Sequence, residues 1–316
     1  MNLPPLPHAP RWGVLLLAAA LAAPTACAKR PTSNRPQVGV TLLTQAHVFY
    51  QDLQKGMEAA ADSLGMDLHI VAGEWDLARQ TSQVENFITQ KMNAIIIAPV
   101  DSRGIVSAIE EANHAGIPVF TVDIAAAGGQ VTSHIASDNA QGGELVGEYL
   151  ATLLHGNGNV AILDQPTLAS VIDRVRGFRE ALAKYPGIHI VAAPAVERGL
   201  RDVAKNKTDN LLQAHPELNA IFGSNDDCAL GALASVRASG KRNIIIVGFD
   251  ATPEARAAIA DGGPLKADAI QHPETIGRRA IETVYRTLHG EKVPPVVAVP
   301  VGIVDKDSLS AAAPAH

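Results

Sequence analysis

Residues 243–255 read NIIIVGFDATPEA: four apolar residues in a row, then a glycine, a phenylalanine and the single carboxylate of Asp250, just before a helix start. A short apolar run followed by a helical segment is typical of a buried strand in an α/β protein. An ionised group at the end of such a strand costs free energy unless hydrogen bonds compensate it. Asp250 is therefore predicted either to cap the helix that starts near Pro253 or to face a ligand.

The same strand–helix unit recurs along the chain. Such alternation predicts a parallel sheet covered by helices on both faces. The pattern restarts near residue 139, so we expect an α/β fold with two doubly wound parallel-sheet lobes in tandem. The predicted strands are 37–43, 67–72, 94–99, 117–123, 131–136, 159–163, 188–193, 219–223, 243–250 and 265–270. The predicted helices lie near 49–64, 78–91, 103–115, 139–154, 170–184, 202–214, 226–239 and 273–288, with a short one from Pro253.

A second strand ends in the same way as the first. The stretch 117–123, IPVFTVD, places Asp123 at its carboxyl end, as 243–250 places Asp250. Ligands of doubly wound sheets bind outside the carboxyl ends of the strands. Two such sheets facing one another would bring both carboxylates to one cleft, where a ligand could supply the hydrogen-bond donors that they need.

The N-terminal segment reads as a leader. Arg11 precedes the apolar run 14–23, which is about half the ~20 residues of a membrane-spanning helix and is typical of a secretory signal. Cys27 follows two small residues, as at a bacterial lipoprotein cleavage site, where the cysteine is lipidated. Removal of the leader by an ordinary signal peptidase is the alternative. We expect a leader over 1–27, a linker over 28–35, and an exported chain that is periplasmic or lipid-anchored to the cell envelope.

Composition excludes several classes of function. The formal charge is −6 and no basic run follows the first 35 residues, which argues against a nucleic-acid partner. The 11 histidines show no zinc-ligand spacing, and no phosphate loop or nucleophile elbow is present. Cys228, the only other cysteine, is predicted to be a small core-facing helix residue. We expect no enzyme activity, no cofactor and no metal.

Five stretches together resemble the type I periplasmic sugar-binding proteins of ABC transporters, and within that family the ribose-binding members. They are SHIASDNAQGGELVGEYL (133–150), RVRGF (174–178), NDDCALGAL (225–233), VGFDATPEA (247–255) and IQHPETIG (270–277). The resemblance implies two lobes joined by a three-segment hinge, which close on a sugar. It places the N-terminal lobe at 36–137 plus 272–300 and the C-terminal lobe at 138–271 plus 301–310, with crossings near 136–139, 269–273 and 299–303.

The resemblance also implies a function and partners. It implies an extracytoplasmic solute-binding protein, a monomer, that captures a sugar or polyol between its lobes and delivers it to an ABC permease. The alternative is a ligand-sensing module for a chemoreceptor or membrane sensor kinase.

Site residues follow from the resemblance position by position. Asp123 and Asp250 match carboxylates that accept hydrogen bonds from sugar hydroxyls, and Arg174 matches an arginine that donates to sugar oxygens. The other matching positions are Asn225 and Gln271, amides that both donate and accept, and Phe49 and Tyr50, aromatics that cover the sugar's C–H surface.

Local alternatives remain for most of these residues. Arg174 could pair with Asp173 or Glu180 on a helix surface, and Asn225 could cap the helix after it. Phe49 could be a core residue. Trp75, which follows a strand, is expected in lobe packing but could reach the cleft.

Four positions depart from the ribose-binding pattern. His47 stands in place of asparagine, Tyr50 in place of phenylalanine and Ile124 in place of arginine, while Gly199 falls near the second lobe's stacking aromatic. An aliphatic side chain cannot replace the donors of a guanidinium. We therefore expect His47 and Ile124 to line a pocket that suits a sugar or polyol other than ribose.

Overall fold

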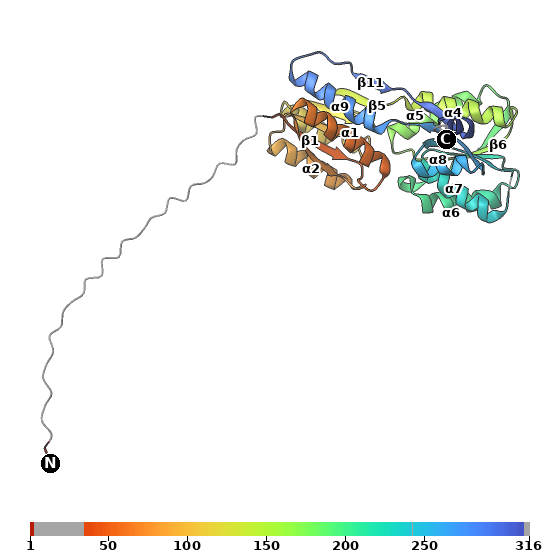
Figure 1. Ribbon diagram of the computed structural model, residues 1–316, viewed down its shortest axis with the longest axis horizontal. Helices are drawn as coiled ribbons and strands as arrows, with labels where there is room; N and C mark the ends of the chain where they lie inside the picture. Colours follow the sequence, from red (N-terminus) through yellow and green to blue (C-terminus); the bar gives the residue numbers. More distant parts are fainter. Residues whose placement is uncertain (3–34, 242, 313–316) are drawn as a thin grey trace. The chain divides into compact units, whose positions relative to one another are not determined.

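Two six-stranded sheets organise the residues that the computed structural model describes, which are 1–2, 35–241 and 243–312 (Figure 1). The first sheet has the order β11-β5-β4-β3-β1-β2 and contains β1 (Gln37–Leu42), β2 (Asp67–Ala72), β3 (Ala94–Ile97), β4 (Val119–Val122), β5 (Val131–Ser137) and β11 (Val296–Val299). The second has the order β12-β10-β9-β8-β6-β7 and contains β6 (Asn157–Leu163), β7 (Gly187–Ala192), β8 (Ala220–Gly223), β9 (Ile245–Asp250), β10 (Leu265–Ile270) and β12 (Gly302–Asp305). Cys27 and residues 3–34 of the predicted leader and linker lie outside the described residues.

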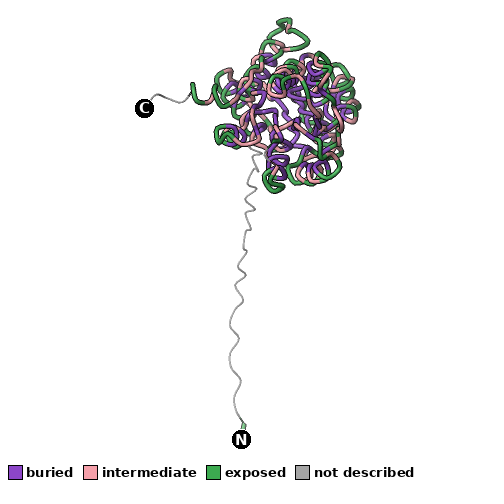
Figure 2. The backbone as a smooth tube through the Cα atoms, turned by 90° about the vertical axis from the view of Figure 1, so that its right-hand side faces the viewer, coloured by how far each residue is buried: buried purple, intermediate pink, exposed green. Residues whose placement is uncertain are grey.

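Helices follow the strands as the alternation predicts. Those associated with the first sheet are α1 (Val48–Leu64), α2 (Leu77–Thr89), α3 (Val106–His114) and α9 (Pro273–Leu288). Those associated with the second are α4 (Asn139–Leu153), α5 (Ala169–Leu182), η1 (Glu197–Gly199), α6 (Arg201–Ala214), α7 (Asp226–Ser239), α8 (Pro253–Ala260) and α10 (Lys306–Ala312). Figure 2 shows the buried segments in the interior and the exposed loops outside them. None of the described helices has the length and apolar character needed to span a membrane.

The predicted strands and helices are present, with ends that differ by a few residues. Strands β11 and β12 were not predicted. Their segment, EKVPPVVAVPVGIVD over 291–305, is interrupted by Pro294, Pro295 and Pro300. Because proline lacks the backbone N–H that pairs in a sheet, such a segment does not read as a strand. Strand β12 also pairs antiparallel with β10, so the second sheet is parallel except at this edge.

The chain passes between the two sheets three times: from β5 to α4, from β10 to α9, and from β11 to β12. The fold therefore has two α/β lobes joined by three segments, as the sequence predicts. We call the lobe built on β1 to β5 the first lobe and the lobe built on β6 to β10 the second lobe. The residue bounds proposed for each lobe stay a prediction.

Close helix packing in the second lobe sets the base of the cleft. A Cβ atom at Gly177 of α5 would lie 2.0 Å from the carbonyl oxygen of Ala140 in α4, and one at Gly143 would lie 2.0 Å from that of Arg174. Only glycine permits this approach. It holds Arg174 against the N-terminal turn of α4.

Candidate ligand-binding site

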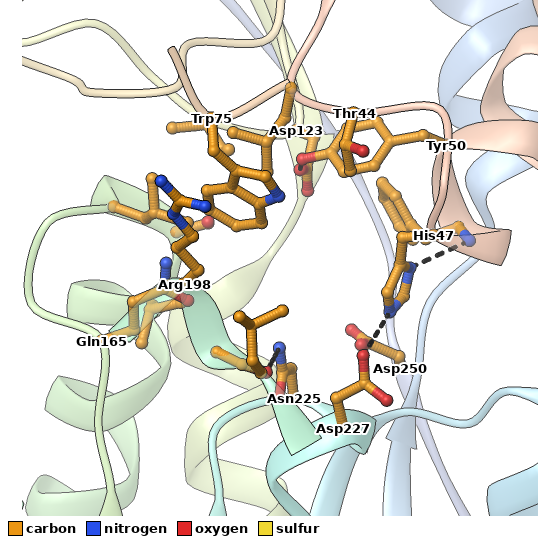
Figure 3. Close-up of a pocket in the computed structure, with 18 of the residues that line it drawn as sticks. Thr44, His47, Tyr50, Trp75, Asp123, Gln165, Arg198, Asn225, Asp227 and Asp250 are labelled. Carbon is orange, nitrogen blue, oxygen red and sulfur yellow. Dashed lines mark hydrogen bonds and ion pairs between the residues drawn. The ribbon is translucent and has the colours of Figure 1, made fainter. Parts of the chain in front are cut away.

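A pocket of about 190 Å³ lies between the carboxyl ends of the two sheets, with side chains from both lobes around it (Figure 3). All nine of the predicted ligand-binding residues line it: His47, Phe49, Tyr50, Asp123, Ile124, Arg174, Asn225, Asp250 and Gln271. The structure thus brings together residues that are up to 224 positions apart in the sequence, from His47 to Gln271. Their contact with a ligand stays a prediction.

Asp123 follows β4 in a left-handed backbone conformation, with φ of 61°. Its side chain is buried, and its Oδ2 accepts a hydrogen bond of 2.6 Å from the Tyr50 hydroxyl. Burial raises the pKa of the Asp123 carboxyl to about 6, against the opposing effects of the Arg174 charge and the Tyr50 hydrogen bond. The remaining oxygen of Asp123 is available as an acceptor.

Asp250 ends β9 with φ of 119°, again in a strained region that residues other than glycine rarely adopt. Its Oδ1 accepts from Gln271 Nε2 at 2.6 Å and from Arg174 Nη1 at 3.4 Å. The capping alternative is wrong, because Thr252 is the N-cap of α8 and its side chain accepts from the Ala255 amide. Asp250 is instead held as a fixed carboxylate at the base of the pocket.

Arg174 is buried, and its guanidinium is oriented by contacts on several sides. Nε donates to Asn139 Oδ1 at 2.8 Å, Nη1 donates to the Ser224 carbonyl at 3.0 Å, and the group lies over the Phe249 ring, 3.9 Å from its centroid. The surface-pairing alternative is wrong for this residue. Its neighbour Arg176 makes the ion pairs with Asp173 and Glu180.

The side-chain amides of Asn225 and Gln271 have different roles. Asn225 is the N-cap of α7: its Oδ1 accepts from the Cys228 amide at 2.8 Å, and its Nδ2 donates to the Gly199 carbonyl at 3.3 Å. Gln271 is buried, and its Oε1 has no hydrogen-bond partner among the described residues. A buried acceptor left unpaired is costly, so a ligand hydroxyl is the natural partner for Gln271.

The aromatic pair is buried at the start of α1. The rings of Phe49 and Tyr50 meet edge to face, with centroids 5.2 Å apart and an interplanar angle of 81°. Burial, followed by the Asp123 charge, raises the pKa of the Tyr50 hydroxyl well above its usual value, so this group remains a donor. Ile124 is 1 % exposed and adds apolar wall beside Asp123.

His47 links the two lobes. Its Nδ1 accepts from the Phe49 amide at 3.1 Å and so caps α1, while its Nε2 lies 4.0 Å from Asp227 Oδ2 of α7 (Figure 3). An imidazole whose Nδ1 accepts carries its proton on Nε2, which here faces Asp227. His47 is therefore both a helix cap and a contact across the cleft.

This double role can be separated by mutation. We expect His47→Ala to lower the free energy of unfolding by about 1 kcal/mol, because a helix cap is lost. His47→Asn should keep the cap, because asparagine is a preferred N-cap residue, and should cost less than His47→Ala although it shortens the side chain that faces Asp227. Chemical denaturation of both variants measures the difference. Equal losses in the two variants would contradict the capping role.

A buried pair of acids lies behind the pocket. Asp226 Oδ2 accepts from the Thr252 amide at 2.6 Å, and its carboxyl group contacts that of Asp268. Burial, followed by the Asp250 charge, raises the pKa of Asp226 to about 7, while burial and Asp226 raise that of Asp268 well above its usual range. The two carboxyl groups are best satisfied by sharing one proton. The described residues include no group of three or more His, Cys, Asp or Glu side chains placed to hold a metal ion.

Twelve further residues line the pocket, among them Gln165, Leu168 and Arg198, which the sequence did not single out, and Trp75, which was expected in lobe packing with the cleft as an alternative. The only available signal was the position of Trp75 after a strand. At Gly199, where the second lobe's aromatic was expected, φ is 60°, and a Cβ atom would lie 2.6 Å from Asn225 Nδ2. The aromatic residues around the pocket therefore come from the first lobe alone, within the described part of the chain.

Comparison with known proteins gives consistent matches. Residues 38–292 match the model of the periplasmic binding protein domain. The chain is 36% identical over 300 residues to the ribose import binding protein RbsB of Bacillus subtilis (strain 168), covering 91% of this chain and 93% of that protein. A Mycobacterium smegmatis ABC transporter solute binding protein with bound glycerol has a TM-score of 0.82 at 34% identity, covering 88% of this chain and 96% of that one. An Actinobacillus succinogenes 130z solute binding protein with bound D-allose has a TM-score of 0.81 at 30% identity, covering 88% of this chain and 100% of that one.

Proposed function

The chain belongs to the family of periplasmic binding proteins, and from this premise we propose that it captures a neutral sugar or polyol of about one ring in size and passes it to an ABC permease. Members of this family are binding proteins, not enzymes. The family also places the chain outside the cytoplasm. A lipid anchor at Cys27, a monomeric state and a permease partner belong to this proposal.

The balance of hydrogen-bonding groups in the pocket carries the proposal. Asp123 and Asp250 present carboxylate oxygens from opposite lobes, and Gln271 adds an amide oxygen with no partner among the described residues. Much of the donor capacity of Arg174 is already used by Asn139, Ser224 and Asp250. A pocket with an excess of acceptors favours a ligand with several hydroxyl donors.

Charge and shape narrow the ligand class further. Anionic ligands would meet two buried carboxylates, and the buried Arg174 cation disfavours a cationic ligand. The rings of Phe49 and Tyr50 offer apolar surface to C–H groups. A polyhydroxylated neutral ring has both kinds of surface.

The names of the relatives support import as the use of this binding. One related protein is named for ribose import, and solved relatives hold glycerol and D-allose. No finding supports the alternative of a sensing module. Ile124 in place of an arginine is the reason to expect a hydroxyl pattern other than that of ribose.

A thermal-unfolding screen tests the proposal. The exported chain is heated with D-ribose, D-allose, xylitol, glycerol and myo-inositol, and with glucose 6-phosphate and putrescine as anionic and cationic controls. One neutral compound at 100 times its Kd should add about 2.7 kcal/mol to the free energy of unfolding. Stabilisation by the anion or the diamine alone would overturn the proposed ligand class.

A further inference from the structure

Two loops beside the pocket have unusual backbone conformations. Glu74 and Trp75, between β2 and α2, have φ of 52° and 63°, and Arg198 and Gly199, within η1 and at its end, have φ of 56° and 60°. Such angles are uncommon for residues with a side chain and persist only where the surroundings fix them. Local contacts must therefore hold each of these two loops in its conformation.

The first loop is fixed by the carboxylate of Glu74. One of its oxygens accepts from Thr44 Oγ1 at 2.7 Å, and the other accepts from the Gln45 amide at 3.0 Å. The Trp75 amide donates to the Leu43 carbonyl at 3.4 Å. These bonds attach the loop to the carboxyl end of β1, so the Trp75 indole is held over the pocket.

The second loop belongs to the second lobe and is fixed by contacts within that lobe. The Val196 amide donates to the Asp164 carbonyl at 2.7 Å, and the Gly199 amide donates to the Val196 carbonyl at 3.1 Å. Asn225 holds the Gly199 carbonyl from α7. Because Gly199 has no room for a side chain, the residue that this loop sends toward the cleft is Arg198.

Trp75 and Arg198 stand between two cavities. A groove of about 680 Å³ adjoins the pocket, and the two share three lining residues, Trp75, Gln165 and Arg198. In Figure 3 the indole of Trp75 and the guanidinium of Arg198 lie at the same end of the pocket. One side chain comes from each lobe, so this wall is complete only when the lobes face each other.

The Trp75 and Arg198 side chains can contact both apolar and polar parts of a ligand. The indole has a flat apolar face, which the second lobe does not supply because Gly199 stands where an aromatic was expected. Within the described part of the chain, the Arg198 side chain makes no hydrogen bond or ion pair. Its guanidinium thus has donors available for a hydroxyl, in a pocket otherwise rich in acceptors.

We propose that Trp75 and Arg198 form an interlobe gate that closes the pocket around one sugar ring or a polyol of that size. The gate is a specificity determinant. It admits the free ligand and excludes derivatives whose substituent would extend from the pocket into the adjoining groove. This inference rests on the proposed function, since it concerns the size limit of the same ligand.

The test measures selectivity rather than affinity alone. Calorimetry on the exported chain gives the Kd of the best neutral ligand from the screen and of its mono-O-methyl derivatives, one for each hydroxyl. The unmodified chain should reject the derivative substituted toward the gate by about 100-fold. In Trp75→Ala/Arg198→Ala, that derivative should regain at least about tenfold relative to the free ligand, while the other derivatives should keep their ratios.

Two controls accompany the test. Lys207→Ala changes a residue that lines the groove but not the pocket. It should leave the Kd of each derivative, relative to that of the free ligand, unchanged. Trp75 is the only tryptophan beyond residue 34, since Trp12 lies in the leader. In a chain that keeps the leader, Trp12→Phe leaves Trp75 as the only tryptophan, and ligand binding should then change the Trp75 emission. Thermal unfolding should show that the Trp75→Ala/Arg198→Ala variant is folded.

The outcomes separate the gate from the proposed function. If no neutral compound binds the unmodified chain, the proposed function fails and the gate fails with it. A different result overturns the gate alone: the free ligand binds, but in the double variant the Kd of every methyl derivative relative to that of the free ligand changes by no more than about threefold.

Discussion

Replacing Asp250 with alanine is expected to abolish ligand binding and to lower the free energy of unfolding by about 3–5 kcal/mol. The loss of stability follows because Arg174 is buried 3.4 Å from Asp250 and would lose its ion-pair partner while keeping its charge. The loss of affinity should exceed about 100-fold, because the ligand loses an acceptor and both Arg174 and Gln271 lose the group that orients them. Calorimetry and chemical denaturation measure the two effects.

A paired substitution separates stability from binding. Asp250→Ala/Arg174→Met removes both charges, and replacing a buried ion pair by apolar groups is often neutral for stability. We expect the double variant to recover most of the lost free energy of unfolding but none of the affinity. Retention of affinity within about threefold in Asp250→Ala would contradict the assignment of this carboxylate to the ligand.

Much of the site was predictable because it lies at the ends of strands. Asp123 and Asp250 each close an apolar run, and the sheet architecture brings such ends to one cleft. The partners of these carboxylates were not predictable from spacing. The bond from Tyr50 to Asp123 spans 73 residues within the first lobe, and the pair of Arg174 with Asp250 spans 76 within the second, so both depend on how helices and strands pack inside each lobe.

Arg198 was not predicted in the pocket, and Trp75 was placed there only as an alternative to lobe packing. Both reach the pocket from loops that turn through left-handed conformations, which no apolar periodicity signals. The Tyr50 hydroxyl also relates two departures from the ribose-binding pattern, Tyr50 and Ile124, to each other. Ile124 brings no donor to Asp123, whereas Tyr50 brings one that phenylalanine would lack.

Ligand affinity is expected to fall as pH decreases below about 6, and Asp123 is the group responsible. Its pKa is about 6, raised chiefly by burial, and a hydroxyl that donates to Asp123 favours the ionised form. Binding therefore releases a proton when the carboxyl is protonated beforehand. Affinity should weaken by up to about tenfold for each pH unit below the pKa. Calorimetry between pH 5 and pH 8 measures this slope.

The same shift predicts the opposite dependence for the stability of the ligand-free chain. Because folding raises the Asp123 pKa above its ordinary value of 3.8, the contribution of this group is most favourable at low pH and is lost as pH rises through about 6. Asp226, with its pKa raised to about 7, acts in the same direction. Asp123→Asn should therefore be more stable than the unmodified chain at pH 8 by roughly 3 kcal/mol at most, although it binds ligand poorly.

Tyr50→Phe provides the matched control for the pH dependence of affinity. Its hydroxyl lowers the Asp123 pKa through a hydrogen bond of 2.6 Å, so removing it should move the pH midpoint of binding upward. Asp123→Asn should lose this part of the pH dependence altogether, while the contribution of the Asp226–Asp268 pair remains. Parallel affinity profiles for the unmodified chain and Asp123→Asn would show that another group governs binding. An unmoved midpoint in Tyr50→Phe would show that this hydroxyl does not tune the carboxylate that receives the ligand.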